Sequence, residues 1–496
     1  MDSRKRNILI ALMVAMFLGA VEGTVVTTAI PTIVKELQGF HIISLVFSTY
    51  LLTSAISTPI YGKLSDLYGR KQMLTIGIII FLIGSFLCGL SQNMYMLIGF
   101  RALQGIGAGA IFTVTYTIVG DVFSLEERPR VQGTIGSVWG IASLIGPFFG
   151  GVLIDTLSWH WIFFINIPFG ILSIFLIQKN LTEPFTRKNH KIDFGGIITL
   201  SLAILSFLNL FLGENPRSGF FTAGSIFISI ISIAAFYSIE KRASEPIIPF
   251  DIFTRTNIII SIISFLASAV LIGADVYLPI YIQNVLGFSP KISGLALAPM
   301  SMGWLAAAVI LGKFMVKQGA KAGILVSNII LLASTFLLLT LTTNSSLLLV
   351  IIYVTVMGFG FGGAFTILTI TVQEAVDFNR RGVATATNSL LRTLGQTVGV
   401  SVFGSVFNMF ITGYFINQGI IGINPGNLYS AAANSAVTVE QIKLSINSSL
   451  HFLYIIFIIL SAAVLLLSLA MHSMGGKYKI LRPDEVKPQD SLDNNN

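Results

Sequence analysis

Long apolar runs separated by short polar segments recur along the whole chain. Each run is long enough, at about 20 residues, to cross a hydrocarbon core of roughly 30 Å as an α-helix. The runs are continuous, whereas strands of a membrane β-barrel alternate apolar and polar residues. The pattern predicts an all-α polytopic membrane protein with fourteen spans, at 8–30, 42–62, 73–92, 95–118, 133–154, 161–178, 192–212, 219–240, 257–282, 292–312, 321–341, 346–372, 388–414 and 450–471.

The basic residues indicate which loops face the cytoplasm. Arg101 and Arg392 fall inside spans, and one set of loops holds only Lys35, Arg217, Lys291 and Lys443. The other 24 of the 30 Lys and Arg residues lie in the alternate loops and in both tails. Cytoplasmic loops carry an excess of Lys and Arg, so both termini are predicted to be cytoplasmic.

The composition supports a membrane protein and argues against a soluble domain, a nucleic-acid-binding protein and a cleaved signal peptide. The chain is 54% hydrophobic and 10% charged, whereas soluble domains carry roughly 25% charged residues. The net charge of +8 follows the loop pattern, so we expect no nucleic-acid partner. The first apolar run carries Glu22 and lacks a small-residue cleavage site, so it is predicted to be an uncleaved span rather than a signal peptide.

An internal repeat predicts two related halves. Residues 62–71 read GKLSDLYGRK and residues 312–321 read GKFMVKQGAK, each after the second span of its half. Repeated halves around a midplane site are typical of secondary transporters. The predicted divisions are a six-helix half at 1–180, a two-helix insert with its linkers at 181–245, a second six-helix half at 246–475, and a tail at 476–496.

The sequence gives no support for an enzyme, a cofactor or a metal site. Cys88 is the single cysteine and the five histidines are scattered, so no ligand cluster forms by spacing. GIGAGA at 105–110 follows no strand, so it is not expected to bind a dinucleotide. Its glycines, with Gly358 and Gly362, are better interpreted as close helix contacts.

Three charged residues inside spans are the strongest functional candidates. An ionised Glu22 at its depth costs at least a few kcal/mol, so it must face water, be protonated or have a cationic partner. Arg101 in the fourth span needs a partner for the same reason. Asp275 lies in the first span of the second half, nearer its outer end. Arg392 lies close to a cytoplasmic span end, where it is expected to snorkel to the interface.

Several motifs resemble the major facilitator superfamily. GKLSDLYGRKQML (62–74) is similar to its loop signature, and LIGFRALQGIGAGA (97–110) resembles its fourth-helix motif. GIASLIGPFFGG (140–151), VEGTVVTTAIP (21–31) and WHWIFFINIP (159–168) resemble motifs of its fourteen-helix branch, the EmrB/QacA-type drug:proton antiporters. Three positions depart from the pattern: Glu22 replaces the usual Asp, His160 replaces a common Arg, and Val316 stands where the first repeat has Asp66.

The resemblance implies roles for named residues. Arg101 would modulate the acid Glu22 during proton coupling. A cytoplasmic gate would comprise Gly62, Asp66, Gly69, Arg70 and Asp121. The antiporter helix motif would comprise Gly146, Pro147, Gly150 and Gly151. Aromatic rings could also line a pocket and make cation–π contacts, although core packing is the competing interpretation for each; these candidates are Tyr50, Trp139, Tyr277, Tyr281 and Trp304.

The resulting functional prediction is a proton-coupled multidrug efflux antiporter of the bacterial cell membrane. It would act as a monomer in the lipid bilayer, exchanging protons for lipophilic, cationic small molecules. Export of one antibiotic, lipid precursor or metabolite would use the same scaffold. A non-transporting receptor or a membrane enzyme is disfavoured, because the chain has no folded soluble domain and no nucleophile–base pair.

Overall fold

A computed structural model describes residues 3–123, 127–181, 193–208, 210, 219–243, 246, 250, 253–376, 381–429 and 437–471. Every regular element within these ranges is helical. The principal helices are α1 (Ser3–Leu37), α2 (Ile43–Tyr68), α3 (Arg70–Cys88), α4 (Met94–Val122), α5 (Arg128–Thr156), α6 (Trp161–Phe164), α7 (Asn166–Asn180), α8 (Phe194–Leu208), α9 (Gly219–Glu240), α10 (Arg255–Ile280), α11 (Pro290–Gln318), α12 (Ala320–Leu339), α13 (Leu347–Glu374), α14 (Arg381–Asn417) and α16 (Val439–Ala470).

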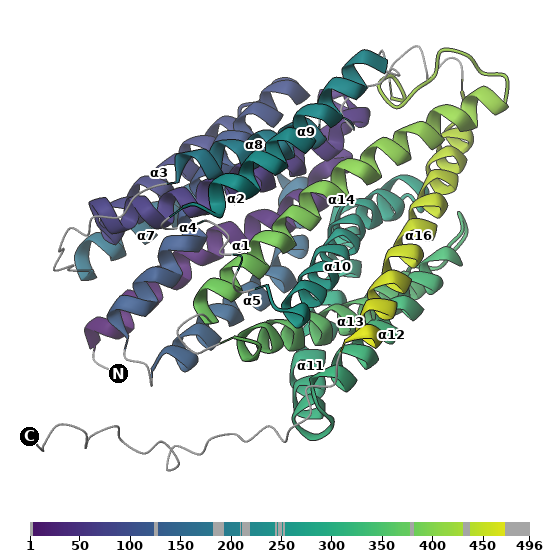
Figure 1. Cartoon of the computed structure of the whole chain (residues 1–496). Helices are drawn as coiled ribbons and strands as arrows, with labels where there is room; N and C mark the ends of the chain where they lie inside the picture. Colours follow the sequence, from purple (N-terminus) through teal and green to yellow (C-terminus); the bar gives the residue numbers. More distant parts are fainter. Residues whose placement is uncertain are drawn as a thin grey trace, which may run out of the picture.

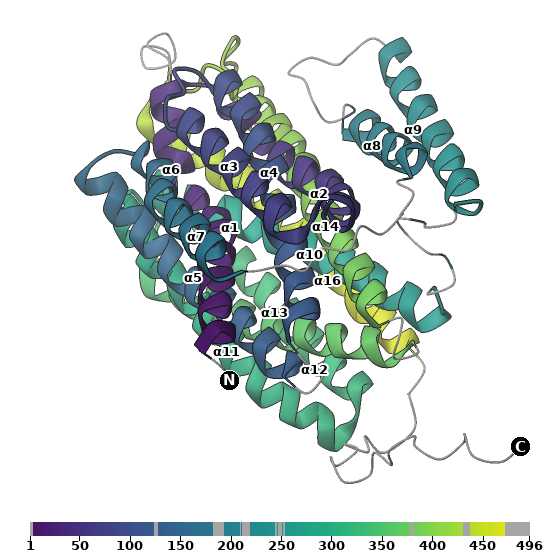
Figure 2. The ribbon, with the colours of Figure 1, turned by 90° about the vertical axis from the view of Figure 1, so that its left-hand side faces the viewer.

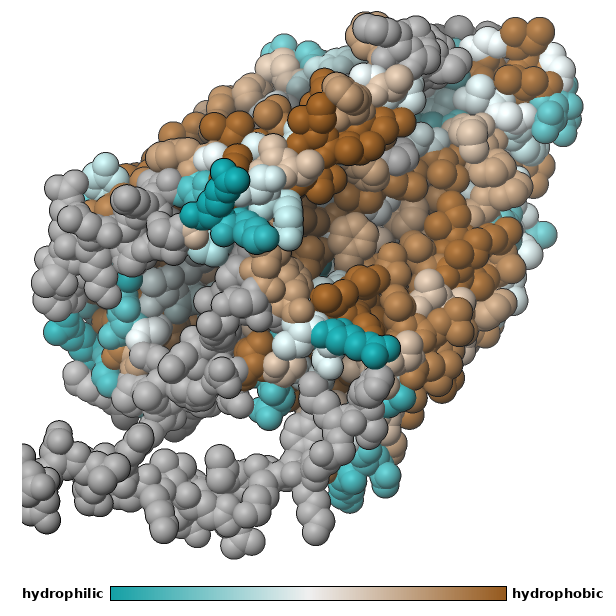
Figure 3. Space-filling view, viewed as in Figure 1, coloured by the Kyte–Doolittle hydropathy of each residue, from teal (hydrophilic) through white to brown (hydrophobic). Residues whose placement is uncertain are grey.

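The helices form one long bundle. The N-terminus lies at one end, and the loop that follows α14 lies at the other (Figure 1). Hydrophobic side chains dominate the middle of the visible face (Figure 3). Most of the hydrophilic residues on that face lie toward the two ends of the bundle. This arrangement fits a bundle that presents apolar side chains to lipid. We refer to the two ends as cytoplasmic and outer, following the prediction from the basic residues.

Thirteen helical segments in the described ranges are long and apolar enough to cross a membrane. They correspond to all the predicted spans except 192–212. That region contains α8, which is apolar but only 15 residues long, or about 22 Å at the usual helical rise. The number of apolar helices therefore agrees with the sequence, with α8 the shortest of them.

Packing divides the helices into two groups. Helices α1–α7 pack mainly among themselves and form the N-terminal group, and α10–α16 form the C-terminal group. Helices α8 and α9 pack on each other as a separate pair beside α2 and α14 (Figure 2). Leu52 of α2, Ile204 of α8 and Leu394 of α14 belong to one small apolar cluster. Helix α8 thus covers a line along which the two groups meet.

The repeated loop has the same backbone shape in both groups. Gly69, between α2 and α3, has φ 96° and ψ 142°, and Gly319, between α11 and α12, has φ 92° and ψ 160°. A side chain would strain the backbone at such positive φ values. The second glycine of each repeat therefore has one conformational role, and the sequence match between the loops has a structural basis.

Several contacts join the two groups at the outer end. The Gln283 side-chain amide donates to the Thr28 carbonyl at 2.9 Å, and that of Asn408 donates to the His41 carbonyl at 2.6 Å. The Lys291 backbone N–H donates to Asp155 Oδ2 at 3.3 Å. These hydrogen bonds hold α14, the start of α11 and the helical turn Tyr281–Val285 after α10 against the N-terminal group at this end.

Candidate functional site

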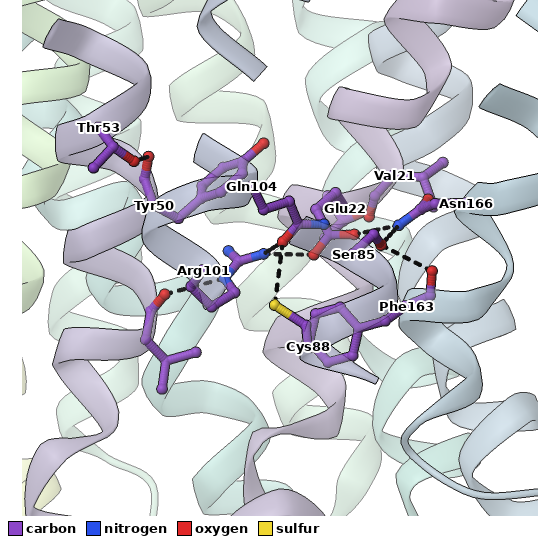
Figure 4. Close-up of polar contacts among 12 residues, drawn as sticks. Val21, Glu22, Tyr50, Thr53, Ser85, Cys88, Arg101, Gln104, Phe163 and Asn166 are labelled. Carbon is purple, nitrogen blue, oxygen red and sulfur yellow. Dashed lines mark hydrogen bonds and ion pairs between the residues drawn. The ribbon is translucent and has the colours of Figure 1, made fainter. Parts of the chain in front are cut away.

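A buried ion pair lies inside the N-terminal group (Figure 4). Arg101 Nη1 on α4 donates to Glu22 Oε1 on α1 at 2.5 Å. Both residues are 1% exposed. Glu22 was expected to face water, to be protonated or to have a cationic partner, and in the structure it has the cationic partner. Glu22 is likewise the partner that Arg101 requires. Both charges are therefore enclosed by the protein.

The second carboxylate oxygen has a partner from a third helix. Asn166, the first residue of α7, donates through Nδ2 to Glu22 Oε2 at 2.6 Å. The same nitrogen lies 2.9 Å from Ser85 Oγ on α3, and that hydroxyl donates to the Phe163 carbonyl at 2.9 Å. The Glu22 carboxylate on α1 therefore accepts hydrogen bonds from α4 and α7, and Asn166 extends the network to Ser85 on α3. A change at the carboxyl group thus affects four helices, α1, α3, α4 and α7.

The guanidinium of Arg101 is held on three further sides. Its Nε donates to the Val46 carbonyl at 3.2 Å, and Nη1 donates to Gln104 Oε1 at 2.8 Å. The guanidinium carbon lies 4.1 Å from the centre of the Tyr50 ring on α2, which is a cation–π distance. Tyr50, a candidate pocket aromatic, thus contacts Arg101 directly.

Glycines allow these helices to approach closely. A Cβ at Gly84 on α3 would be 2.6 Å from the Gln104 backbone, and one at Gly105 on α4 would be 2.4 Å from the Tyr50 carbonyl. Gly358 and Gly362 of α13 meet α11 in the same way. The interpretation of these glycines as helix contacts is confirmed. Without the small residues, α2, α3 and α4 could not bring their polar side chains together around Glu22.

The antiporter helix motif on α5 packs on both α1 and α11. A Cβ at Gly146 would lie 2.0 Å from Thr24 Oγ1, two residues from Glu22, and one at Gly150 would lie 3.0 Å from Val25. On the other side, a Cβ at Gly151 would be 2.5 Å from the Lys291 Cα. Pro147 presents its carbonyl to Gly294, whose Cβ would lie 1.9 Å away. The motif therefore connects the helix of Glu22 to the C-terminal group.

The predicted gate residues lie at the cytoplasmic end. Arg70 Nε forms an ion pair with Asp121 Oδ2 at 2.5 Å, and Arg70 Nη1 donates to the Ser65 carbonyl at 3.2 Å. Gly62 and Gly69 flank this end of α2. The Asp66 side chain lies outside the described residues. Arg70 and Asp121 thus connect the start of α3 to the end of α4.

Asp275 does not join the cluster around Glu22. It is half-buried near the outer end of α10. Within the described part of the chain, no ion pair or hydrogen bond connects its carboxylate to Glu22, Arg101 or Asn166. Its predicted role in coupling stays a prediction.

The other candidate aromatics have different surroundings. Tyr277 and Tyr281 are fully buried, the first against Phe407 and the second with its hydroxyl donating to the Thr342 carbonyl at 2.7 Å. Trp139 is 39% exposed and stacks on Phe112. Trp304 is half-buried, stacks on Phe365 and lies in a tilted arrangement beside Phe361. Packing accounts for the two tyrosines, whereas both tryptophans are partly exposed.

Asn166 and Ser85 complete the site, although neither is among the candidates predicted from the sequence. Both are polar residues in apolar runs, and Asn166 lies inside the motif WHWIFFINIP. An amide at that position is the signal that could have identified it, because buried polar groups require partners.

Comparison with known proteins gives relatives along most of the chain. Multidrug resistance protein 3 of Bacillus subtilis is 35% identical over 439 residues, covering 88% of this chain and 85% of the relative. Multidrug transporter protein MdtP of the same species is 34% identical over 409 residues, covering 82% and 76%. Multidrug efflux pump SdrM of Staphylococcus aureus is 32% identical over 427 residues, covering 86% and 93%.

The fold also matches solved structures. A bacterial homologue of the human lysosomal transporter Spinster, in an inward-facing and occupied conformation, superimposes with a TM-score of 0.69. The match covers 95% of this chain and 97% of that protein, at 14% sequence identity. This likeness concerns the fold.

The family model of the Major Facilitator Superfamily matches residues 12–400. This range includes the ion pair, the glycine-rich α5 motif and the repeated loop. Relatives named as transporters and efflux pumps identify a transporter rather than an enzyme, and the apolar helices fit a multi-pass protein of the bacterial plasma membrane. The chain belongs to the Major Facilitator Superfamily.

Proposed function

We propose that this transporter is a proton-coupled antiporter that exports lipophilic, cationic drug-like compounds by alternating access. The observation that carries the proposal is the buried Glu22–Arg101 ion pair, closed by Asn166. The names of three relatives, all multidrug transporters or resistance proteins, support the substrate class. The motifs favour the fourteen-helix drug:proton branch, with α8 and α9 as its two-helix insert.

Protonation of Glu22 supplies the coupling step. A neutral Glu22 leaves the Arg101 guanidinium buried without a counter-ion, which is strongly unfavourable. The helices must then rearrange until Arg101 reaches water or another partner. Because α5 packs on α1 beside Glu22 and on α11 across the groups, such a rearrangement would move one group relative to the other. Each charge that enters across 100 mV contributes roughly 2.3 kcal/mol.

The access state follows from the positions of the inter-group contacts. The hydrogen bonds from Gln283, Asn408 and Lys291 all lie at the outer end. We infer that the structure is closed outside and open toward the cytoplasm, where a drug would enter. The Arg70–Asp121 ion pair would act as a latch on the cytoplasmic side that changes between states.

Reconstitution into liposomes tests the proposal. An imposed proton gradient should drive movement of a cationic dye in the wild type. Movement of the dye down its own gradient should in turn drive protons across the membrane in the opposite direction. Glu22→Gln should abolish both, whereas Glu22→Asp, which keeps a carboxyl group, should retain them in part. Full gradient-driven transport by Glu22→Gln, in protein that reaches the membrane, would contradict the coupling role. Export of a single compound from a broad panel would favour the specific exporter.

A further inference from the structure

A second arginine inside the predicted spans, Arg392, has surroundings unlike those of Arg101. It lies on α14, and its guanidinium carbon is 4.0 Å from the centre of the Phe365 ring on α13. Trp304 of α11 stacks on the same ring, with centroids 5.4 Å apart and planes 20° apart. Three helices of the C-terminal group each contribute one side chain to this cluster, which we call the Arg392 stack.

The Arg392 stack lies deep in the bundle. Trp304 is the midpoint of α11, which runs from Pro290 to Gln318, so about 21 Å of helix separates it from either end. The sequence position predicted that Arg392 would snorkel to the cytoplasmic interface. In the structure its side chain lies over Phe365 instead. The position of Arg392 near the start of the predicted span 388–414 indicates depth only, whereas the cation–π contact depends on how α14 packs on α13.

Arg392 has no counter-ion in the described part of the chain. Glu22 neutralises Arg101 in the N-terminal group. Among the described residues, by contrast, no carboxylate pairs with Arg392 and no acceptor takes a hydrogen bond from its guanidinium. The guanidinium carries five N–H donors, and donors left unpaired away from water cost about 1–3 kcal/mol or more. The side chain is half-buried, so its donors reach open space. Acyl chains offer no acceptor, so that space must hold water or an anionic ligand.

We propose that Arg392 binds the carboxylate of cargo molecules, and that the transporter therefore accepts aromatic amphiphiles that carry a carboxylate, including zwitterions. A guanidinium stacked on a ring keeps its edge free for a bidentate carboxylate. The half-buried Trp304 presents an aromatic surface beside it for the apolar part of the cargo. This inference rests on the proposed export function and adds a substrate class to it.

The test uses two forms of one dye. A rhodamine with a free carboxylate is a zwitterion, and its methyl ester is a cation with the same ring system. Export of both is measured in cells and in liposomes as a ratio of rates. Arg392→Gln should lower the zwitterion-to-ester ratio by about tenfold or more, because a charge-assisted pair is lost. Arg392→Lys should give an intermediate ratio, since it keeps the charge but not the planar fork.

A matched control and a binding measurement complete the design. Arg242→Gln removes one charge from an exposed position at the end of α9 and should leave the ratio unchanged. Fluorescence anisotropy of the zwitterion on detergent-purified protein should show weaker binding for Arg392→Gln by the same factor. If Arg392→Gln does not give a single species in size-exclusion chromatography, the comparison of wild type with Arg392→Lys decides.

Two results would overturn the inference while leaving multidrug export intact. One is an equal zwitterion-to-ester ratio in the wild type and in Arg392→Gln or, where that variant does not fold, in Arg392→Lys. The other is a wild type that exports the ester but not the zwitterion. A wild type that exports neither dye, and moves no compound of a broad cationic panel under a proton gradient, would instead contradict the proposed function itself.

Discussion

Arg101 and Glu22 form an ion pair whose side chains are 1% and 0% exposed. Two opposite charges removed from water stabilise a protein only when every remaining polar atom is well partnered. Asn166 and Gln104 provide such partners here. The pair is consequently sensitive to the loss of either charge, and a proton is the smallest change that removes one.

A double-mutant cycle measures this sensitivity. Arg101→Gln or Glu22→Gln alone leaves one buried charge unpaired, and each should lower the free energy of unfolding by about 3–5 kcal/mol. The double variant should be more stable than the sum of the two losses predicts, because no charge stays unpaired. Thermal or denaturant unfolding of purified protein provides the values. Strict additivity would show that the two side chains do not interact energetically.

Gly146 tests the contact between α1 and α5. A methyl group there would meet the Thr24 hydroxyl at 2.0 Å, so Gly146→Ala should force the helices apart and cost about 1–3 kcal/mol. It should also slow transport, because the displaced helix α1 carries Glu22. Gly136→Ala, on the same helix, has nothing within 4 Å of the added atom. That control should be neutral or stabilising by up to about 1 kcal/mol. Equal behaviour of the two variants in unfolding and dye efflux would argue against the contact.

The ion pair between Arg70 and Asp121, which we propose as a latch, allows effects on stability and on turnover to be measured separately. Asp121 is 50% exposed, and exposed ion pairs contribute only about 0–1 kcal/mol. Asp121→Asn should therefore change the unfolding temperature little but lower the export rate clearly. Lys5 and Glu127 form another ion pair in the N-terminal group, at 2.6 Å with both side chains partly exposed. Glu127→Gln should leave export near the wild-type rate. If both variants lose export equally, the effect belongs to surface charge rather than to the latch.

Much of the fold could be predicted from the chain because hydrophobicity and small residues act locally. The repeated loop was visible as matched glycines, and Gly69 and Gly319 have the same backbone conformation. The charges inside the spans required partners on physical grounds, and Arg101 has one in Glu22. The family resemblance linked Arg101 to Glu22, but the direct contact between the two side chains depends on how α1 and α4 pack.

What could not be predicted depends on side-chain direction. Asn166 reaches Glu22 across 144 positions of the chain, and no local pattern encodes such a contact. Tyr50 and Tyr277 were equivalent candidates for a pocket, yet the first lies under Arg101 and the second packs on Phe407. The distances along a helix that predict depth say nothing about which neighbour a long side chain meets, as Arg392 shows.

The outer contacts give a test of alternating access. The Lys291 backbone N–H lies 3.3 Å from Asp155 Oδ2, and the Lys291 Cα is close to Gly151. Cysteines placed by Asp155→Cys and Lys291→Cys should therefore be joined by a short thiol cross-linker while the outer end is closed. The native Cys88 is buried, so it can stay in place. Cross-linking should stop export, because a drug cannot leave unless α5 and α11 separate at this end, and a cleavable cross-linker should restore export when reduced. Asp155→Cys alone, treated identically, should keep its activity. Undiminished export from fully cross-linked protein would mean that the outer ends of α5 and α11 do not part during transport.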